Sequence, residues 1–293
     1  MSQSASLLAD LRREIDRVDT AIAQLLVERR NVVAEIGRIK GGGLAFRPGR
    51  EAMVLRRLIA ETSGQVAPET LVRVWREVFA AATRLQGGFN IAVCAPAGHR
   101  ELWDLARGHF GSGTDVTRVD RPAQALRALG EDTAQVAVLP APSDDELWWT
   151  GLIEGQPRSN VVARLPFLYH ERQSDPLTAF AVAKVAPDPS DDDQTLLVVE
   201  APAGISRGRL KDLLAAAGLQ AEWLAVVRPR AESPDAAHLI AVDGFLEADD
   251  RRLVPLGQDN PRDLRRVVRL GAYARQLRAG ERAGSLPDPV GTA

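Results

Sequence analysis

The first forty residues carry an apolar stripe with helical spacing. Leucine, isoleucine and valine recur at steps of three and four from Leu8 to Ile39, and no proline or glycine interrupts them before Gly37. Glycines at 41–43 end the pattern. At about 1.5 Å per residue, a helix over 7–40 would be about 50 Å long. The stripe predicts a single long helix that packs against a partner helix.

Two shorter helices are predicted after the long one. The first covers 50–61, directly after Arg47-Pro48-Gly49, and the second begins near Pro68 and ends at the glycine pair 87–88. Three helices, one of them very long, cannot bury this apolar seam within one chain. An interlocked helical dimer is therefore the expected fold of residues 1–88.

The periodicity changes after residue 88, where predicted strands and helices alternate. Strands are expected at 90–95, 116–119 and 135–140, and helices at 100–110 and 123–129. This alternation is typical of an α/β layer, which we assign to residues 89–193. An acidic, proline-containing stretch at 187–193 is expected to be a solvated spacer.

A third region is predicted at 194–275, where one helix lies among three strands. The helix is expected at 207–218 and the strands at 196–202, 223–229 and 238–244, and the segment VVRLGAYAR at 267–275 ends the region. Residues 276–293 read as a disordered polar tail. The expected chain thus has an all-α domain, an α/β domain and an α+β domain.

Composition narrows the class of protein. The 293 residues carry a formal net charge of −2, which is no general signature of nucleic-acid or membrane binding. We find no secretory signal and no apolar run of about eighteen residues. Cys94 is the one cysteine, so a disulfide framework is excluded. We expect a cytoplasmic protein without nucleic-acid or membrane partners.

Three cations on the predicted first helix form a candidate anion site. Arg29 and Lys40 are eleven residues apart, which places them within about 20° around the helix and about 16 Å apart along it. Their long side chains can share one small ligand. Arg12 lies about 25 Å from Arg29 along the axis, so it can contribute only to the site of a second subunit.

The polar positions lie in three segments with a familiar order: LRREIDRVDTAIAQLLVERRNVVAEIGRIK, FRPGREAMVLRRLI and VWREVFAAATRLQ. Together these segments resemble the all-helical (type II) chorismate mutase domain, especially the version that begins bifunctional chorismate mutase-prephenate dehydratases. The resemblance covers about the first ninety residues. It implies a homodimer in which Arg12 is donated from the partner subunit and Arg29 holds a carboxylate of chorismate.

The same resemblance implies roles for four further residues. Lys40 would contact both a carboxylate and the breaking ether oxygen, and Gln86 would also face that oxygen. Arg50 and Glu51 match an Arg-Glu pair whose glutamate takes the ring hydroxyl of the substrate. The rearrangement to prephenate is unimolecular, so positioning and preorganised cations suffice, and no metal or cofactor is expected. Because Gln86 is neutral, activity should not require acidic pH.

Two positions depart from the family's pattern. Arg47 stands where some members have an aspartate near the hydroxyl, and Ala82 stands where many have a serine that hydrogen-bonds a carboxylate. Losing one neutral hydrogen bond should weaken binding by about 1 kcal/mol, which would not abolish the site.

The segment AQVAVLPAPSDD is similar to the first, periplasmic-binding-like lobe of prephenate dehydratase. The second lobe of that enzyme is largely missing from 89–193. Its Thr-Arg-Phe signature survives only as Thr178-Ala179-Phe180, without the arginine. His99 and His170 are expected to be surface or loop residues. The resemblance therefore implies a reduced, inactive relative of the dehydratase.

The third region resembles the regulatory ACT domain that closes these bifunctional enzymes. Gly208 and Leu210 lie where the family has a Pro-Gly-Ala-Leu turn, and Arg228 and Pro229 lie where it has Glu-Ser-Arg-Pro. The resemblance makes these four residues candidates for binding phenylalanine as an effector. A purely structural pairing of ACT units is the alternative that we favour, because only half of the second motif is kept.

The predicted function is that of a chorismate mutase acting toward phenylalanine and tyrosine. Two enzyme alternatives are a true bifunctional mutase-dehydratase and a lyase that acts on isochorismate through the same helical scaffold. The alternative from another class is a non-catalytic regulatory subunit that senses an aromatic amino acid and binds another shikimate-pathway enzyme.

Overall fold

A computed structural model describes residues 2–41, 44–98, 100–155, 158–170, 177–229, 234–253, 256 and 262–279. The predicted tail at 276–293 falls largely outside these ranges. The chain divides into two compact units. One consists of Met1–Ala45 and Ala81–Gly88, and the other of Phe46–Ala80 and Phe89–Ala293.

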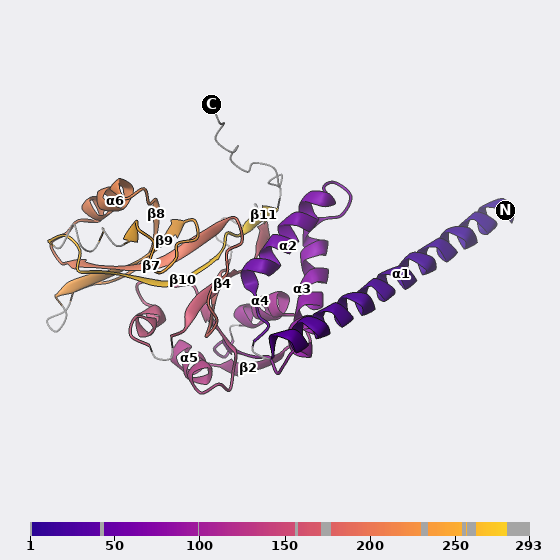
Figure 1. The fold of residues 1–293 in the computed structure, drawn as a ribbon, viewed down its shortest axis with the longest axis horizontal. Helices are drawn as coiled ribbons and strands as arrows, with labels where there is room; N and C mark the ends of the chain where they lie inside the picture. Colours follow the sequence, from indigo (N-terminus) through magenta and orange to yellow (C-terminus); the bar gives the residue numbers. More distant parts are fainter. Residues whose placement is uncertain are drawn as a thin grey trace, which may run out of the picture. The chain divides into compact units, whose positions relative to one another are not determined.

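The first unit contains the long helix that the apolar stripe predicts. Helix α1 (Ser2–Lys40) runs without a break through 39 residues (Figure 1). Ion pairs between residues three apart, such as Arg17 with Glu14, line its polar side. Its apolar side is exposed: Leu11 is 54% exposed, Ile22 52% and Leu25 63%. Large apolar side chains repeated at helical spacing and left in water mark a surface that needs a partner.

The second unit begins with a helical hairpin. Helix α2 (Pro48–Glu61) is followed by α3 (Pro68–Leu85), whose last residues belong to the first unit. Ala52 and Leu55 of α2 and Phe79 of α3 pack with Phe167 in one buried cluster. The hairpin is thus attached to the rest of the second unit by a small apolar core.

Among the described residues, nine strands form one mixed sheet in the order β2-β1-β3-β6-β4-β10-β7-β9-β8. The bounds of these strands are β1 (Asn90–Cys94), β2 (Asp115–Val119), β3 (Val136–Pro140), β4 (Asn160–Leu165), β6 (Ala179–Ala183), β7 (Asp193–Pro202), β8 (Ala221–Val227), β9 (Asp235–Asp243) and β10 (Arg266–Ala274). A separate pair is formed by β5 (Leu168–His170) and β11 (Leu277–Ala279). The helical region is therefore followed by a mixed α/β region.

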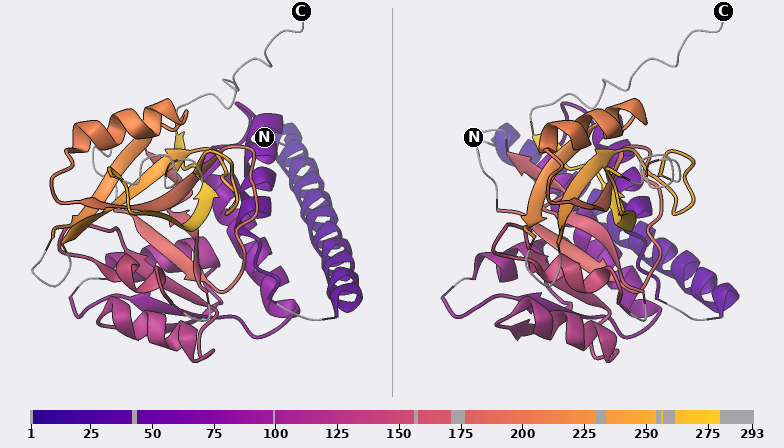
Figure 2. Two further views of the ribbon diagram at one scale, coloured as in Figure 1. Left: turned by 60° about the vertical axis from the view of Figure 1, so that its left-hand side comes forward. Right: turned by 90° about the vertical axis from the view of Figure 1, so that its left-hand side faces the viewer.

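Helices cover both faces of this sheet. Helix α4 (Glu101–Phe110) follows β1, α5 (Pro122–Gly130) follows β2, and α6 (Arg207–Ala216) follows β7. A short 3₁₀ helix, η1 (Trp148–Leu152), follows β3. Alternate residues of β7 belong to two cores, Leu196 to the core that includes α5 and Leu197 to the core under α6. Helices α5 and α6 therefore lie on opposite faces, as Figure 2 shows.

One sheet joins the two regions that were expected to be separate domains, 89–193 and 194–275. Strand β10 pairs in parallel with β4 through Gly271 and Val161, and on its other side it pairs antiparallel with β7. Phe180 and Leu239, one from each region, share a single buried cluster. Strand pairing and core packing both cross the expected boundary between residues 193 and 194. A division into two domains at that point stays a prediction.

Candidate functional site

The three predicted cations of the first unit lie along α1. Arg12 is exposed and Arg29 is half-buried. Lys40 is the last residue of the helix, and its side chain lies outside the described part of the structure. An uninterrupted helix keeps Arg12 about 25 Å from Arg29 along the axis, so the two cannot contact one ligand within a single chain.

Gln86 lies against the last turns of α1. The residue directly follows α3 and is half-buried. A Cβ atom added to Gly37 would lie 3.1 Å from Cγ of Gln86, so the glutamine packs where Gly37 carries no side chain. Gly37 is three residues before Lys40 in the same helix. The structure therefore brings Gln86 to the end of α1, where sequence reasoning places the lysine.

The Arg50-Glu51 pair lies in the first turn of α2, in the second unit. Arg50 is exposed, whereas Glu51 is half-buried and forms an ion pair with Arg76 of α3, with 2.7 Å between Nη1 and Oε2. Arg76 is 4% exposed, and its guanidinium lies 5.6 Å from the ring centre of Phe167. Burial lowers the pKa of Arg76, and the carboxylate of Glu51 opposes that shift.

Arg76 is a residue that sequence reasoning missed. It interrupts an apolar helix face in which Trp75 and Phe79 are neighbours. A charged side chain at such a position is buried only when it is paired, and this is the signal that could have found it. Arg76 orients the carboxylate of Glu51 from the adjacent helix.

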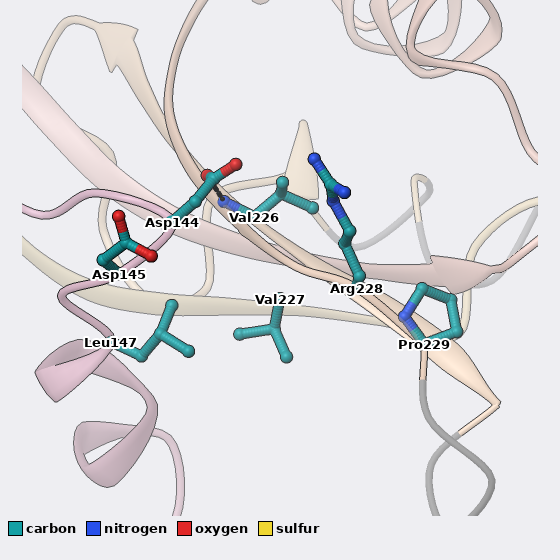
Figure 3. Close-up of a pocket in the computed structure, with 7 residues that line it drawn as sticks. All are labelled: Asp144, Asp145, Leu147, Val226, Val227, Arg228 and Pro229. Atoms are coloured by element: carbon teal, nitrogen blue, oxygen red, sulfur yellow. Dashed lines mark hydrogen bonds between the residues drawn. The ribbon is translucent and has the colours of Figure 1, made fainter.

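The predicted effector residues separate into two groups. Arg228 and Pro229 help to line a pocket of about 350 Å³ at the end of β8, together with Asp144, Asp145, Leu147, Val226 and Val227 (Figure 3). The carboxylate of Asp144 lies beside β8 in this pocket and accepts a 2.9 Å hydrogen bond from the backbone N–H of Val226. Leu210 instead is 1% exposed, in the core under α6, and Gly208 lies in the first turn of that helix.

The remnant of the dehydratase signature lies in the core. Phe180 of β6 is 1% exposed, and its ring lies 5.4 Å from that of Tyr273 and 6.3 Å from that of Trp148. Ala179 is fully buried. Trp149 belongs to the same cluster and is fully buried. His99 and the side chain of His170 lie outside the described residues.

The described part of the chain contains no group of three or more His, Cys, Asp or Glu side chains arranged to hold a metal ion. Within the same ranges, none of the helices combines the length and hydropathy that a bilayer crossing requires.

Comparison with known proteins finds a family model that matches the helical region. The chorismate mutase type II family model matches residues 11–87. The bifunctional chorismate mutase/prephenate dehydratase of Neisseria gonorrhoeae is 37% identical over 147 residues, which are 50% of this chain and 40% of that protein. The protein of the same name from Pseudomonas aeruginosa is 27% identical over 47% of this chain and 40% of its own length. The chain spans about two fifths of the length of these curated relatives.

The T-protein of Haemophilus influenzae is 31% identical over 46% of this chain and 39% of its own length. Among solved structures, GqqA, described as a quorum-quenching acylase, matches with a TM-score of 0.49 and 18% identity over 64% of this chain and 95% of that chain. A prephenate dehydratase from Streptococcus mutans matches with a TM-score of 0.46 and 14% identity over 64% and 99%.

Proposed function

Because residues 11–87 form a chorismate mutase type II domain, we propose that this chain catalyses the rearrangement of chorismate to prephenate, in the cytoplasm. The observation that carries the proposal is that one family model spans most of α1 and the whole of α2 and α3. The predicted site residues, from Arg12 on α1 to Gln86 after α3, fall within that match.

The proposed site is completed by a second copy of the chain. Arg12 of one copy and Arg29 of the other bind the two carboxylates of chorismate, because a guanidinium makes paired hydrogen bonds to a carboxylate. The exposed apolar side of α1 supports a dimer, since a partner helix would remove it from water. The packing of Gln86 on Gly37 supports placing this amide beside Lys40.

The proposed mechanism is positional and electrostatic. Cations at both ends hold the substrate folded, so that the carbons that form the new bond approach each other. Lys40 and the amide N–H of Gln86 stabilise negative charge that develops on the ether oxygen as its bond to carbon breaks. Arg50 and Glu51 hold the ring hydroxyl. No proton has to move, so neutral Gln86 serves without being protonated.

The C-terminal region is proposed to be inactive as a dehydratase and to resemble an ACT unit at 194–275. Two observations support this proposal: position 179 is an alanine where the dehydratase signature has an arginine, and Phe180 is buried. A bifunctional mutase-dehydratase is the second candidate, and the observation that favours it is that the gonococcal relative aligns over 147 residues, beyond the mutase domain. Phenylalanine would occupy the pocket beside Arg228 if this region binds an effector.

The first experiment follows chorismate depletion at neutral pH with product analysis, with and without phenylalanine. We expect prephenate to accumulate without phenylpyruvate. Arg29→Ala should lower kcat/KM by at least about 100-fold, and Arg30→Ala, its exposed neighbour on α1, should change it less than about twofold. Phenylpyruvate as product would establish the bifunctional candidate instead, and no turnover by the wild type would favour the regulatory subunit.

A subunit-mixing experiment tests the shared site. Arg12→Ala and Arg29→Ala chains, each inactive alone, are mixed in equal amounts and allowed to exchange. Half of the dimers are then hybrids with one intact site, so about a quarter of wild-type activity should return. If full exchange restores none, Arg12 is not donated across an interface.

A further inference from the structure

The connector at 187–193 is not the solvated spacer that its composition predicts. The carboxylate of Asp188 accepts hydrogen bonds from the backbone N–H groups of Gly49 (3.2 Å) and Arg50 (3.1 Å). It also forms an ion pair with Arg47, at 3.2 Å. Its side chain is only 15% exposed. One carboxylate from the α/β region thus covers the start of α2.

Gly49 makes this approach feasible. A Cβ atom at position 49 would lie 2.1 Å from the carbonyl oxygen of Asp188, far inside van der Waals contact. The backbone of the connector therefore rests directly on the first turn of α2. Any side chain at position 49 would push the Asp188 carboxylate away from the helix N-terminus.

A second anchor lies further along α2. Arg56 donates to the carbonyl oxygens of Ser190 (2.6 Å), Asp192 (2.8 Å) and Arg275 (2.9 Å). Asp193 is 4% exposed and accepts a 2.8 Å hydrogen bond from the backbone N–H of Ser190. Because both anchors are made to the same connector, the position of Asp188 is determined by the fold of the second unit.

Helix α2 lacks a cap of its own. Its N-cap residue is Arg47, whose side chain accepts no capping hydrogen bond. A capping oxygen normally comes from a serine, threonine, asparagine or aspartate just before the helix. Here the oxygens come from a residue 139 positions later in the chain. The amides that they bind belong to Gly49 and to Arg50 itself.

We propose that Asp188 is a positioning residue of the mutase site. It holds the first turn of α2, and thereby the Arg50-Glu51 pair that binds the ring hydroxyl; this inference rests on the proposed function. The family's pattern has an aspartate at position 47 in some members, and this chain has an arginine there. In this chain a residue of the C-terminal region supplies the carboxylate at the start of α2.

The test compares Asp188→Ala with Asp191→Asn in the full chain. Asp191 is an exposed acid of the same connector, so Asp191→Asn removes one negative charge and keeps the hydrogen bonds between Asp188 and the start of α2. Asp188→Ala should raise KM for chorismate about fivefold, with kcat within about twofold, because the hydroxyl contact serves binding. Asp191→Asn should leave both parameters unchanged.

Two further variants separate positioning from folding. Gly49→Ala keeps Asp188 but displaces it, and it should raise KM by a similar factor. Adding Arg47→Asp to Asp188→Ala returns a carboxylate to the helix start and should recover most of the lost KM. A lower Tm for Asp188→Ala with an unchanged KM would overturn the inference, as would the absence of any recovery in the double variant.

The activity of the wild type separates failure of the positioning role of Asp188 from failure of the proposed mutase function. If wild type and Asp191→Asn convert chorismate while Asp188→Ala and Gly49→Ala match them, only the positioning role fails. If the wild type does not convert chorismate, the proposed function fails, and the positioning role is overturned with it.

Discussion

Single residues in this protein act through partners on other elements. Glu51, which the sequence marks as a hydroxyl ligand, is held by Arg76 from the next helix, and Arg76 in turn lies against Phe167 of the sheet region. The start of α2 is bound by Asp188. Each of these partners lies at least 25 residues from the side chain or amide that it contacts, so the geometry of the pair is a product of the fold.

Replacing Arg76 with methionine should lower the free energy of unfolding by about 3 kcal/mol. The substitution removes one member of a buried ion pair and leaves Glu51 without its buried cation. Urea denaturation measures the change. Arg73→Met, at an exposed position of the same helix, serves as the control and should stay within about 0.5 kcal/mol of wild type. Equal stability of the two variants would contradict the account of Arg76.

His109 makes stability depend on pH. Burial, together with nearby Arg76, lowers the pKa of His109 well below its ordinary 6.5. The unfolded chain binds a proton near pH 6.5 and the folded chain does not, so protons favour unfolding. The contribution of His109 to the free energy of unfolding is present in full above pH 6.5. Below that pH it falls by up to about 1.4 kcal/mol per pH unit.

Urea denaturation at a series of pH values checks this prediction. His109→Gln should flatten the loss below pH 6.5. The pKa of His238 is also lowered, by burial and Arg207, so the double variant with His238→Gln should be flatter still. If the free energy of unfolding depends on pH in both variants as it does in the wild type, neither histidine causes the loss of stability below pH 6.5.

At the scale of elements, strand β10 lies between β4 and β7 in the sheet. It pairs with β4 on one side and β7 on the other, and so joins the two parts of the sheet. Gly271 permits this pairing. Its φ is +154°, and a Cβ atom there would lie 2.0 Å from the carbonyl oxygen of Val161 in β4. A single glycine thus allows β4 and β10, which are distant in sequence, to approach each other closely.

Gly271→Ala should therefore destabilise the fold by about 2 kcal/mol or more, because either the strand pairing or the backbone conformation must give way. Thermal unfolding provides the measurement. Gly204→Ala is the matched control, since an added Cβ meets no atom within 4 Å there. If both alanine variants melt at the temperature of wild type, the close approach of β10 and β4 is not what requires glycine.

For the whole molecule, the main feature is the apolar side of α1, which stays exposed in the described chain. Its apolar residues recur along 39 residues and remain exposed. A second copy of the chain offers the same stripe, and pairing the two would bury both. The proposed shared site needs the same arrangement, so quaternary structure and activity should be lost together.

Ile22→Glu should convert the proposed dimer into monomers of 31.7 kDa. Ile22 is 52% exposed in the single chain, so the charge costs little until a partner helix would bury it. Sedimentation equilibrium measures the mass, and the mutase assay should fall in parallel. Gln24→Glu adds the same charge about 200° around the helix and should remain dimeric. A dimer that persists in Ile22→Glu would exclude α1 as the interface.

The sequence by itself determined the helices and most strands. Helix α1 follows from its apolar stripe and the glycines after it, and β1, β3 and β9 follow from short apolar runs between turn residues, because these signals are local. Strands β4 and β6 were missed. Their pairing with β3 and β10 joins residues far apart in the chain, which a local pattern does not show. The proposed site residues Arg29, Arg50 and Gln86 are predictions that rest on a familiar order of polar positions along the chain.

Tertiary structure alone decided which surfaces meet. The composition of the acidic connector predicts a spacer, because composition cannot show that Gly49 leaves room for its backbone or that Arg56 donates to two of its carbonyl oxygens. Likewise, Arg76 reads as one more helix cation until its burial beside Glu51 is known. Contacts of this kind depend on the distance between residues that are remote in sequence, and no local periodicity encodes that distance.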